Sequence, residues 1–205
     1  EMKIEELLLI MACDALNLKT ENALSGKLSP TEMSQIGNYM ERIKKMPLKI
    51  LDKGAMKIGE IKSVARMWKK HFDIKELWID HLHLMEGDIQ YSNPEQKFTD
   101  IANQLKALSK ELNIPIIVLA QFNRKEKGDK SMHRISDLKY ASGIEQAADV
   151  IVLLYRPELY DIEQFPKGHK REGQSTKGYA LMHVGKLRLL PKSDVPCHFT
   201  GKHFY

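Results

Sequence analysis

The sequence contains little cysteine: Cys13 and Cys197 are the only two among 205 residues, and they lie far apart. This excludes a disulfide framework and a thiolate zinc cluster, and it favours a reducing, cytoplasmic setting.

Long hydrophobic runs are also missing. The longest apolar stretches are IPIIVLA and VIVLLY, which are too short to span a bilayer, and no signal peptide opens the chain.

A phosphate-binding P-loop is missing as well. That motif reads GxxxxGK followed by Ser or Thr, and it lies between a strand and a helix. The nearest stretch, GHKREGQS at 168–175, has Gln174 in place of the lysine and lies in a polar loop, and GDKS at 128–131 lacks the leading glycine. We reject both. Because the chain begins EMKIEELLLI, without an initiator methionine, we expect it to be a part of a longer protein.

The composition is that of a folded protein with a sizeable core, since 42% of the residues are hydrophobic and 29% are charged. Lysine and arginine number 32 against 27 acidic residues, and the pI is near 9.0. This modest basic excess is compatible with a nucleotide or nucleic-acid partner and does not by itself identify one. No repeat and no long linker divides the chain, which predicts one domain over residues 1–205.

Helical and strand patterns alternate along the chain. Apolar periodicity predicts helices at 3–16, 29–45, 58–72, 94–112 and 143–148, and strands at 48–52, 77–85, 114–120, 149–155, 178–190 and 197–200. Strands separated by helices are typical of a largely parallel α/β sheet with helices on both faces, and the last strands predict antiparallel additions at one edge.

Two of these helices carry clear apolar stripes, and a third carries a start signal. The stripes predict core positions, namely Ile58, Ile61, Ala65, Trp68 and Phe72 in one helix and Phe98, Ile101, Leu105, Leu108 and Leu112 in the other. Ser29, Pro30 and Glu32 form a capping-box pattern at the start of the helix at 29–45.

Asp80 ends the apolar run of the stretch LWIDHLHLM. In open parallel sheets, ligands bind beyond the carboxyl ends of the strands. A carboxylate at that edge can hold a hydrated magnesium ion beside phosphates, because magnesium prefers oxygen ligands. An Asp that caps a helix or stabilises a loop is the structural alternative.

His81 and His83 offer a second kind of site. They alternate with Leu82, so on a strand they would point to the same side and could bind zinc for metal-dependent hydrolysis. A catalytic zinc ion needs a third protein ligand, and the remaining histidines are scattered. Polar residues near the edge of a sheet are the preferred interpretation of the pair.

Several stretches together resemble the motor domain of bacterial replicative helicases of the DnaB type. LWIDHLHLM resembles the Walker B strand of that family, and it is followed in order by NQLKALSKELNIPIIVLAQFNR, ISDLKYASGIEQAADVIVLLYRPELY and HVGKLRLL. The resemblance covers essentially the whole chain and is weakest at 156–176. It implies a RecA-like three-layer α/β sandwich whose first core strand and Walker A loop are absent from this sequence, which would leave apolar faces of the sheet uncovered.

The resemblance also implies roles for single residues. Glu1 is similar to the catalytic glutamate that polarises the attacking water, and Asp80 would hold Mg²⁺ beside ATP. Gln121 would sense the γ-phosphate and link nucleotide state to a DNA-facing loop. Lys186 and Arg188 match a basic pair that is inserted into a neighbouring subunit's nucleotide site; two exposed cations on an edge strand are the alternative.

Contacts with DNA are implied for the loops that face a central channel. Lys139 stands where the family has arginine, whereas Tyr140 and Ala141 depart from the family's acidic and small residues. The basic loop could add phosphate contacts or be a solvated charge run; its members are Arg124, Lys125, Lys127, Lys130 and Arg134.

The resemblance favours an ATP-driven, hexameric DNA helicase of replication that acts on single-stranded DNA, with primase and a helicase loader as further partners and no membrane. The alternative is a non-catalytic relative without a P-loop that binds DNA or caps an oligomer.

Overall fold

The computed structural model describes residues 3–124, 129–165, 167, 171–188 and 194–199. The chain divides into two compact units, Glu1–Gly54 with Phe199–Tyr205, and Ala55–His198. Each unit is described by itself, and the prediction of a single domain over residues 1–205 stays a prediction.

The first unit is helical, with α1 (Ile4–Ala15), α2 (Thr20–Leu24) and α3 (Pro30–Ile43). The capping box at the start of α3 is confirmed: the Ser29 hydroxyl accepts from the Glu32 N–H at 3.2 Å, and the Glu32 carboxylate accepts from the Ser29 N–H at 2.8 Å. The strand predicted at 48–52 is wrong. That segment pairs with no described strand, and its leucines Leu48 and Leu51 are 42% and 45% exposed.

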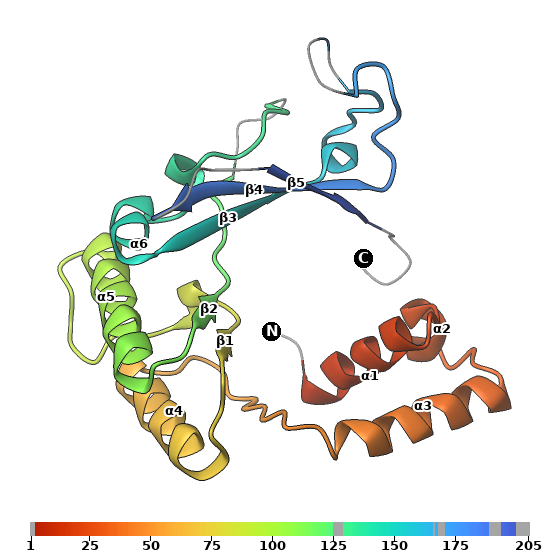
Figure 1. Ribbon diagram of the computed structural model, residues 1–205, viewed down its shortest axis with the longest axis horizontal. Helices are drawn as coiled ribbons and strands as arrows, with labels where there is room; N and C mark the ends of the chain where they lie inside the picture. Colours follow the sequence, from red (N-terminus) through yellow and green to blue (C-terminus); the bar gives the residue numbers. More distant parts are fainter. Residues whose placement is uncertain (1–2, 125–128, 166, 168–170, 189–193, 200–205) are drawn as a thin grey trace. The chain divides into compact units, whose positions relative to one another are not determined.

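The second unit contains the predicted α/β pattern. Its elements are α4 (Ile58–Phe72), β1 (Leu77–Ile79), α5 (Pro94–Leu112), β2 (Ile116–Val118), α6 (Ala141–Ala147), β3 (Val150–Tyr155), β4 (Tyr179–Leu187) and β5 (Asp194–His198), with short 3₁₀ turns η1 (Leu82–Leu84), η2 (Ile135–Asp137) and η3 (Pro157–Tyr160). β1 and β2 pair in parallel, and β3, β4 and β5 form an antiparallel sheet in that order (Figure 1).

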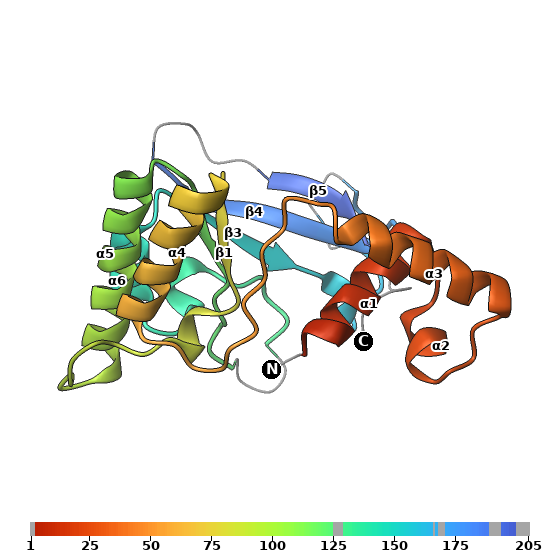
Figure 2. The ribbon, with the colours of Figure 1, turned by 90° about the horizontal axis from the view of Figure 1, so that it is seen from below.

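Helices α4 and α5 cover one face of the parallel pair, and Figure 2 shows them side by side next to β1. Leu77 and Ile79 of β1 pack against them together with Ile116 and Val118 of β2. Trp78 points to the opposite face and is 62% exposed. All three residues of β2 are half-buried.

The apolar stripes of the two helices form the core on that face, as predicted. Ile58, Ala65, Phe98, Ile101, Leu105 and Leu108 are buried. Phe72 is the exception, since it is 52% exposed where α4 ends and the chain turns at Asp73 in the left-handed conformation. The core thus forms without the last residue of the predicted stripe.

The antiparallel sheet leaves an apolar face uncovered, as the sequence predicted. Along β3, Ile151 and Leu153 are buried, while Val150, Val152 and Leu154 are 50%, 46% and 62% exposed. No hydrogen bond between described residues joins β3 to β1 or β2. Within the described residues the strands thus form a parallel pair and a separate antiparallel sheet.

Candidate nucleotide site

Asp80 directly follows the last residue of β1. It is exposed, and it makes no hydrogen bond or ion pair with any other residue that the structure describes. Because β1 and β2 are parallel, their carboxyl ends lie at the same edge. The chain leaving β2 reaches Gln121 three residues after Val118, and the two strand exits stay bonded: the Leu119 N–H donates to the Ile79 carbonyl at 3.0 Å, and the Leu82 N–H donates to the Leu119 carbonyl at 2.9 Å.

The strand predicted at 77–85 ends earlier than expected, at Ile79. After Asp80 the chain enters the 3₁₀ turn η1, and the Nδ1 atom of His81 accepts from the His83 N–H at 3.2 Å. A side chain that bonds to the main chain two residues on competes with strand pairing, which explains the early end.

Both histidines contact Gln121. The side-chain amide nitrogen of Gln121 lies 3.0 Å from the Nε2 atom of His81, and the main-chain N–H of Gln121 donates to the Nδ1 atom of His83 at 3.4 Å. Among the described residues, no group of three or more His, Cys, Asp or Glu side chains could hold a metal ion. The zinc alternative therefore lacks its third ligand in this part of the chain.

His83 lies in an aromatic cluster with Phe98 and Tyr140. Its ring meets Phe98 edge-on at 5.2 Å between centroids, and Phe98 stacks on Tyr140 at 4.8 Å. Burial is the main cause that lowers the pKa of His83, and the main chain of Lys139 partly offsets it. This shift favours the neutral form of the half-buried ring.

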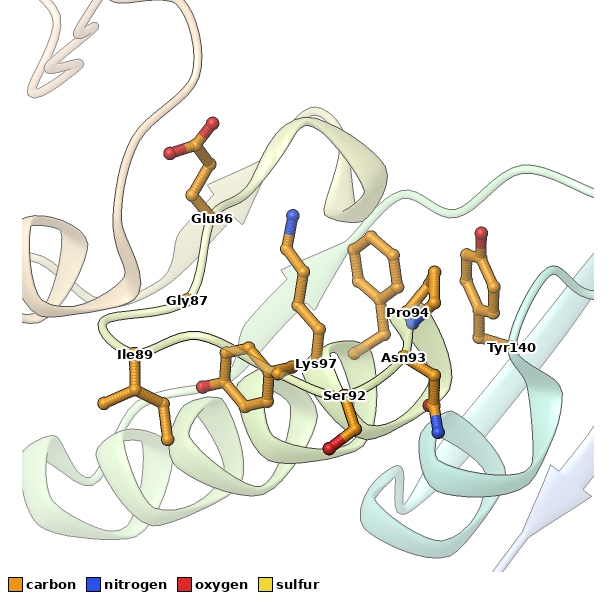
Figure 3. Close-up of a pocket in the computed structure, with 10 residues that line it drawn as sticks. Glu86, Gly87, Ile89, Ser92, Asn93, Pro94, Lys97 and Tyr140 are labelled. Atoms are coloured by element: carbon orange, nitrogen blue, oxygen red, sulfur yellow. The ribbon is translucent and has the colours of Figure 1, made fainter.

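An open pocket of about 550 Å³ lies beside this aromatic cluster. Phe98 and Tyr140 contribute to its wall, and in Figure 3 Ile89 and Tyr140 lie at opposite ends with Lys97 between them. The Lys97 ammonium lies 5.0 Å from the centre of the Phe98 ring. The pocket joins an aromatic surface to a cation, and its wall comes from residues 86–98, at the start of α5 and before it, together with Tyr140.

The segment after Gln121 is bonded to the segment that carries Lys139. The Lys139 N–H donates to the Gln121 carbonyl at 3.2 Å, and the Asn123 N–H donates to the Asp137 carbonyl at 2.7 Å. Phe122 and Leu138 form an antiparallel bridge between these two bonds. Main-chain hydrogen bonds thus connect the segment at Gln121 to the segment at Lys139.

The basic loop is described only in part, since Lys125 and Lys127 lie outside the described residues. Arg124 and Arg134 are exposed, and neither guanidinium forms an ion pair with a described residue. Lys130 instead donates to the Asp161 carbonyl at 3.3 Å. Two of the three described cations are thus available to a ligand.

His133 anchors the same loop, which the sequence did not predict. Its ring stacks on Phe122 at 4.0 Å, and its Nε2 atom lies 3.2 Å from the Tyr160 hydroxyl. Tyr160 follows β3 in η3, so the contact ties the loop to a distant part of the chain. No local pattern signals such a pair.

Lys186 lies near the end of β4, and Arg188 directly follows it. Arg188 forms an ion pair of 3.1 Å with Asp149, and the Lys186 ammonium donates to the Glu145 carbonyl. Asp149 also pairs with Lys106, and this hydrogen bond, followed by the neighbouring positive charges, lowers its pKa. Asp149 was not predicted from the sequence, although the register that pairs Val150 with Leu187 brings it close to Arg188.

Asp80 and Gln121 are thus brought to one edge, with Lys139 bonded to Gln121. Lys186 and Arg188 form a separate group, and no hydrogen bond or ion pair within the described ranges connects the two groups. Glu1 lies outside the described residues.

The chain is similar to known proteins in family, sequence and structure. The family model described as DnaB-like helicase C terminal domain matches residues 1–204. The replicative DNA helicase DnaB of Helicobacter pylori (strain ATCC 700392 / 26695) is 32% identical over 164 residues, which cover 79% of this chain and 34% of the relative. That of Leifsonia xyli subsp. xyli is 30% identical over 205 residues, which cover 99% of this chain and 42% of the relative. The chain therefore spans well under half the length of these relatives.

Solved structures have the same fold. The structure titled "The Structure Of A DnaB-Like Replicative Helicase And Its Interactions With Primase" matches 99% of this chain and 48% of its own with a TM-score of 0.82 and 23% identity. A second solved structure, that of an ATPase domain, matches 99% of this chain and 70% of its own with a TM-score of 0.81 and 21% identity. The predicted RecA-like α/β fold class is confirmed. The chain belongs to the DnaB-like helicase C-terminal domain family.

Proposed function

We propose that this chain is the motor part of an ATP-dependent replicative DNA helicase, which couples nucleotide hydrolysis to movement along DNA and to its unwinding. One observation carries the proposal: Asp80 and Gln121 lie at one edge of the parallel strands, and Gln121 is bonded through its main chain to Lys139. A nucleotide at that edge would be connected to a DNA-facing segment by consecutive hydrogen bonds.

Asp80 would hold Mg²⁺ beside the phosphates of ATP. Magnesium sites of this kind use one or two carboxylates, and waters and phosphate oxygens supply the other ligands. An exposed carboxylate without a partner among the described residues fits that requirement. The ion would neutralise charge on the phosphates, Gln121 would donate to a phosphate oxygen, and Glu1 would polarise the attacking water.

Lys186 and Arg188 would act in a neighbouring subunit's site, which requires an oligomer, as in a hexameric ring. To reach it, Arg188 must leave Asp149. Both side chains of that pair are about half exposed, at 53% and 50%, and exposed ion pairs contribute only about 0–1 kcal/mol. Releasing Arg188 is therefore inexpensive compared with the effect of a guanidinium on phosphoryl transfer, which reaches orders of magnitude in rate.

Single-stranded DNA would contact Lys139, Arg124 and Arg134, with Lys125 as a further contact outside the described residues. Such contacts with phosphates are independent of base sequence and weaken as salt rises. Primase and a loader are the protein partners we propose, with a cytoplasmic site of action at the replication fork. No described helix is both long and apolar enough to cross a bilayer.

The test is an assay of the full-length product of the reading frame with ATP, Mg²⁺ and a forked DNA substrate. We expect ATP hydrolysis that single-stranded DNA stimulates, together with strand separation. A product that binds single-stranded DNA but neither hydrolyses ATP nor separates strands would instead identify the non-catalytic alternative.

A further inference from the structure

We propose that His81 is a positioning residue that sets the orientation of the Gln121 amide, so that the NH₂ group of Gln121 faces the nucleotide. The inference rests on the proposed function of Gln121 and concerns a residue that no motif assigns. It follows from the hydrogen-bonding capacity of three groups: the His83 main-chain N–H, the His81 ring and the Gln121 amide.

The His83 N–H fixes the tautomer of His81. A main-chain N–H can only donate, and it lies 3.2 Å from the Nδ1 atom of His81. Nδ1 must therefore be the acceptor nitrogen of the ring. In a neutral imidazole the other nitrogen then carries the hydrogen, so the Nε2 atom of His81 is a donor.

The donor on His81 in turn constrains the amide of Gln121, whose nitrogen, Nε2, is the atom that the structure places 3.0 Å from the Nε2 atom of His81. The two ends of an amide are nearly equal in size, and the hydrogen-bond network decides which end faces a neighbour. An NH₂ group facing the Nε2–H would set two donors against each other. A half-turn of the amide about its last side-chain bond, which exchanges its two ends, brings the oxygen to His81 and points the NH₂ group away from the ring.

This orientation matters for the proposed sensor. A phosphate oxygen is an acceptor, so Gln121 can bind it only through the NH₂ group. If His81 had the opposite tautomer, Gln121 would present its carbonyl oxygen to the phosphate and the contact would be repulsive. His83 holds the main-chain N–H of the same residue, at 3.4 Å from its Nδ1 atom, so Gln121 is restrained at both its backbone and its side chain.

The tautomer can be measured directly in the 205-residue chain labelled with ¹⁵N-histidine. Two-bond ¹H–¹⁵N correlations distinguish a ring protonated on Nε2 from one protonated on Nδ1, and the His81→Gln variant identifies the signals of His81. We expect hydrogen on Nε2. A His81 ring that carries its hydrogen on Nδ1 would overturn the inference, whatever the protein does with ATP.

Two matched variants test the consequence in the full-length product. His81→Asn keeps an oxygen close to the position of Nδ1 and can still accept from the N–H of residue 83, but it has no donor that reaches Gln121. His81→Gln places an amide N–H close to the position of Nε2 and keeps that donor. Loss of a partner that orients a functional ligand typically costs about 10–100-fold in activity, so we expect His81→Asn to lower kcat by about that factor. KM for ATP should stay within about threefold, and His81→Gln should recover at least about a third of the wild-type kcat.

A double variant separates action through Gln121 from a general structural effect. In a Gln121→Ala background, His81→Asn should lower kcat by no more than about twofold further, because residues that act as a unit are not additive. A further loss as large as in the wild-type background, an unchanged kcat in His81→Asn, or a His81→Gln variant as impaired as His81→Asn would each overturn the inference. A full-length product without any hydrolysis contradicts the proposed function, and the tautomer measurement then decides this inference alone.

Discussion

Asp80 and Gln121 differ in how the protein holds them. Asp80 has no partner among the described residues, whereas Gln121 is bonded through its amide, its N–H and its carbonyl. A carboxylate that shares a hydrated ion with phosphates has to stay free for that ion, while an amide that reports on a phosphate has to be oriented in advance. The two modes of support therefore fit the two proposed roles.

His83 gives a pH prediction at the same scale. Its pKa in the folded protein is lowered by burial, so as pH falls through about 6.5 the unfolded chain takes up a proton that the folded chain does not. The stability contributed by the neutral ring is thus present above about pH 6.5 and is lost below it. Below that point we expect the unfolding free energy of the wild type to fall relative to that of His83→Phe, by at most about 1.4 kcal/mol per pH unit.

Urea unfolding at pH 7.5, 6.5 and 5.5 measures this difference. A difference that is independent of pH, or one that moves in favour of the wild type on acidification, would show that the His83 ring is not held neutral by burial.

At the scale of helices and strands, tight packing of α6 against α5 positions the segment that carries Lys139. Gly143 is buried in α6, and a Cβ atom there would lie 2.0 Å from the Thr99 hydroxyl oxygen and 2.7 Å from its Cα atom. Because the Cα atom is part of the main chain, the contact cannot be relieved by a side-chain rotation alone. The two helices must therefore separate to admit any side chain.

Gly143→Ala should consequently destabilise the protein by about 1–3 kcal/mol, as overpacking does. The matched control is Gly37→Ala in α3, where no atom lies within 4 Å of the added Cβ and the higher helix propensity of alanine should stabilise by about 0.5–1 kcal/mol. Thermal or urea unfolding monitored by circular dichroism measures both. If Gly143→Ala is as harmless as the control, then α5 and α6 do not pack as closely as described.

The helices could be predicted from the sequence because their signals are local. A capping box marked the start of α3, and apolar periodicity delimited α4 and α5 to within a residue.

Strand ends could not be predicted in the same way. Asp80 could be identified because it ends an apolar run. The end of β1 at Ile79, in contrast, depends on the turn that His81 caps. The segment 48–52, which was predicted as a strand, has no partner strand among the described residues. The pairs Asp149–Arg188 and His133–Tyr160 depend on contacts between elements far apart in the chain, which no local pattern encodes.

At the scale of the whole molecule, the main consequence of the proposal is that each nucleotide site is shared between two neighbouring subunits. In the proposal, Asp80 and Gln121 would serve the nucleotide bound by their own subunit, whereas Lys186 and Arg188, which contact Glu145 and Asp149 here, would serve a neighbour's. If these cations act in a neighbour, then activity belongs to pairs of subunits and not to single chains.

Mixing of two inactive variants tests that consequence. Full-length Asp80→Asn and Arg188→Ala should each lack hydrolysis, but a mixed ring contains interfaces that combine an intact Asp80 with a neighbour's intact Arg188. With random assembly at equal amounts, about a quarter of the interfaces are of this kind, so hydrolysis should return to at most about a quarter of the wild-type rate. Mixtures that stay inactive after subunit exchange has been verified would place Arg188 outside a shared site.

Contacts with DNA give a prediction at this scale as well. Replacing Arg134 by alanine should weaken the binding of single-stranded DNA to a similar extent for all base sequences and lower the steepness of its salt dependence, by about 0.7 in the slope of log K against log salt for one lost phosphate contact. Fluorescence anisotropy at several salt concentrations measures both quantities. A loss that depends on base sequence, with an unchanged slope, would contradict a phosphate contact.

The central claim is that Asp80 holds the magnesium ion of a nucleotide at the edge of the β1–β2 pair. Its most direct test is the Mg²⁺-dependent rate of ATP hydrolysis by the full-length product, measured for Asp80→Asn against Asp161→Asn. Asp161 is an exposed residue in the left-handed conformation, which asparagine also adopts readily. We predict that Asp80→Asn lowers the rate by about 100-fold or more with unchanged folding, since it removes charge at the ion, while Asp161→Asn keeps the wild-type rate. A near-normal rate in Asp80→Asn would contradict the account.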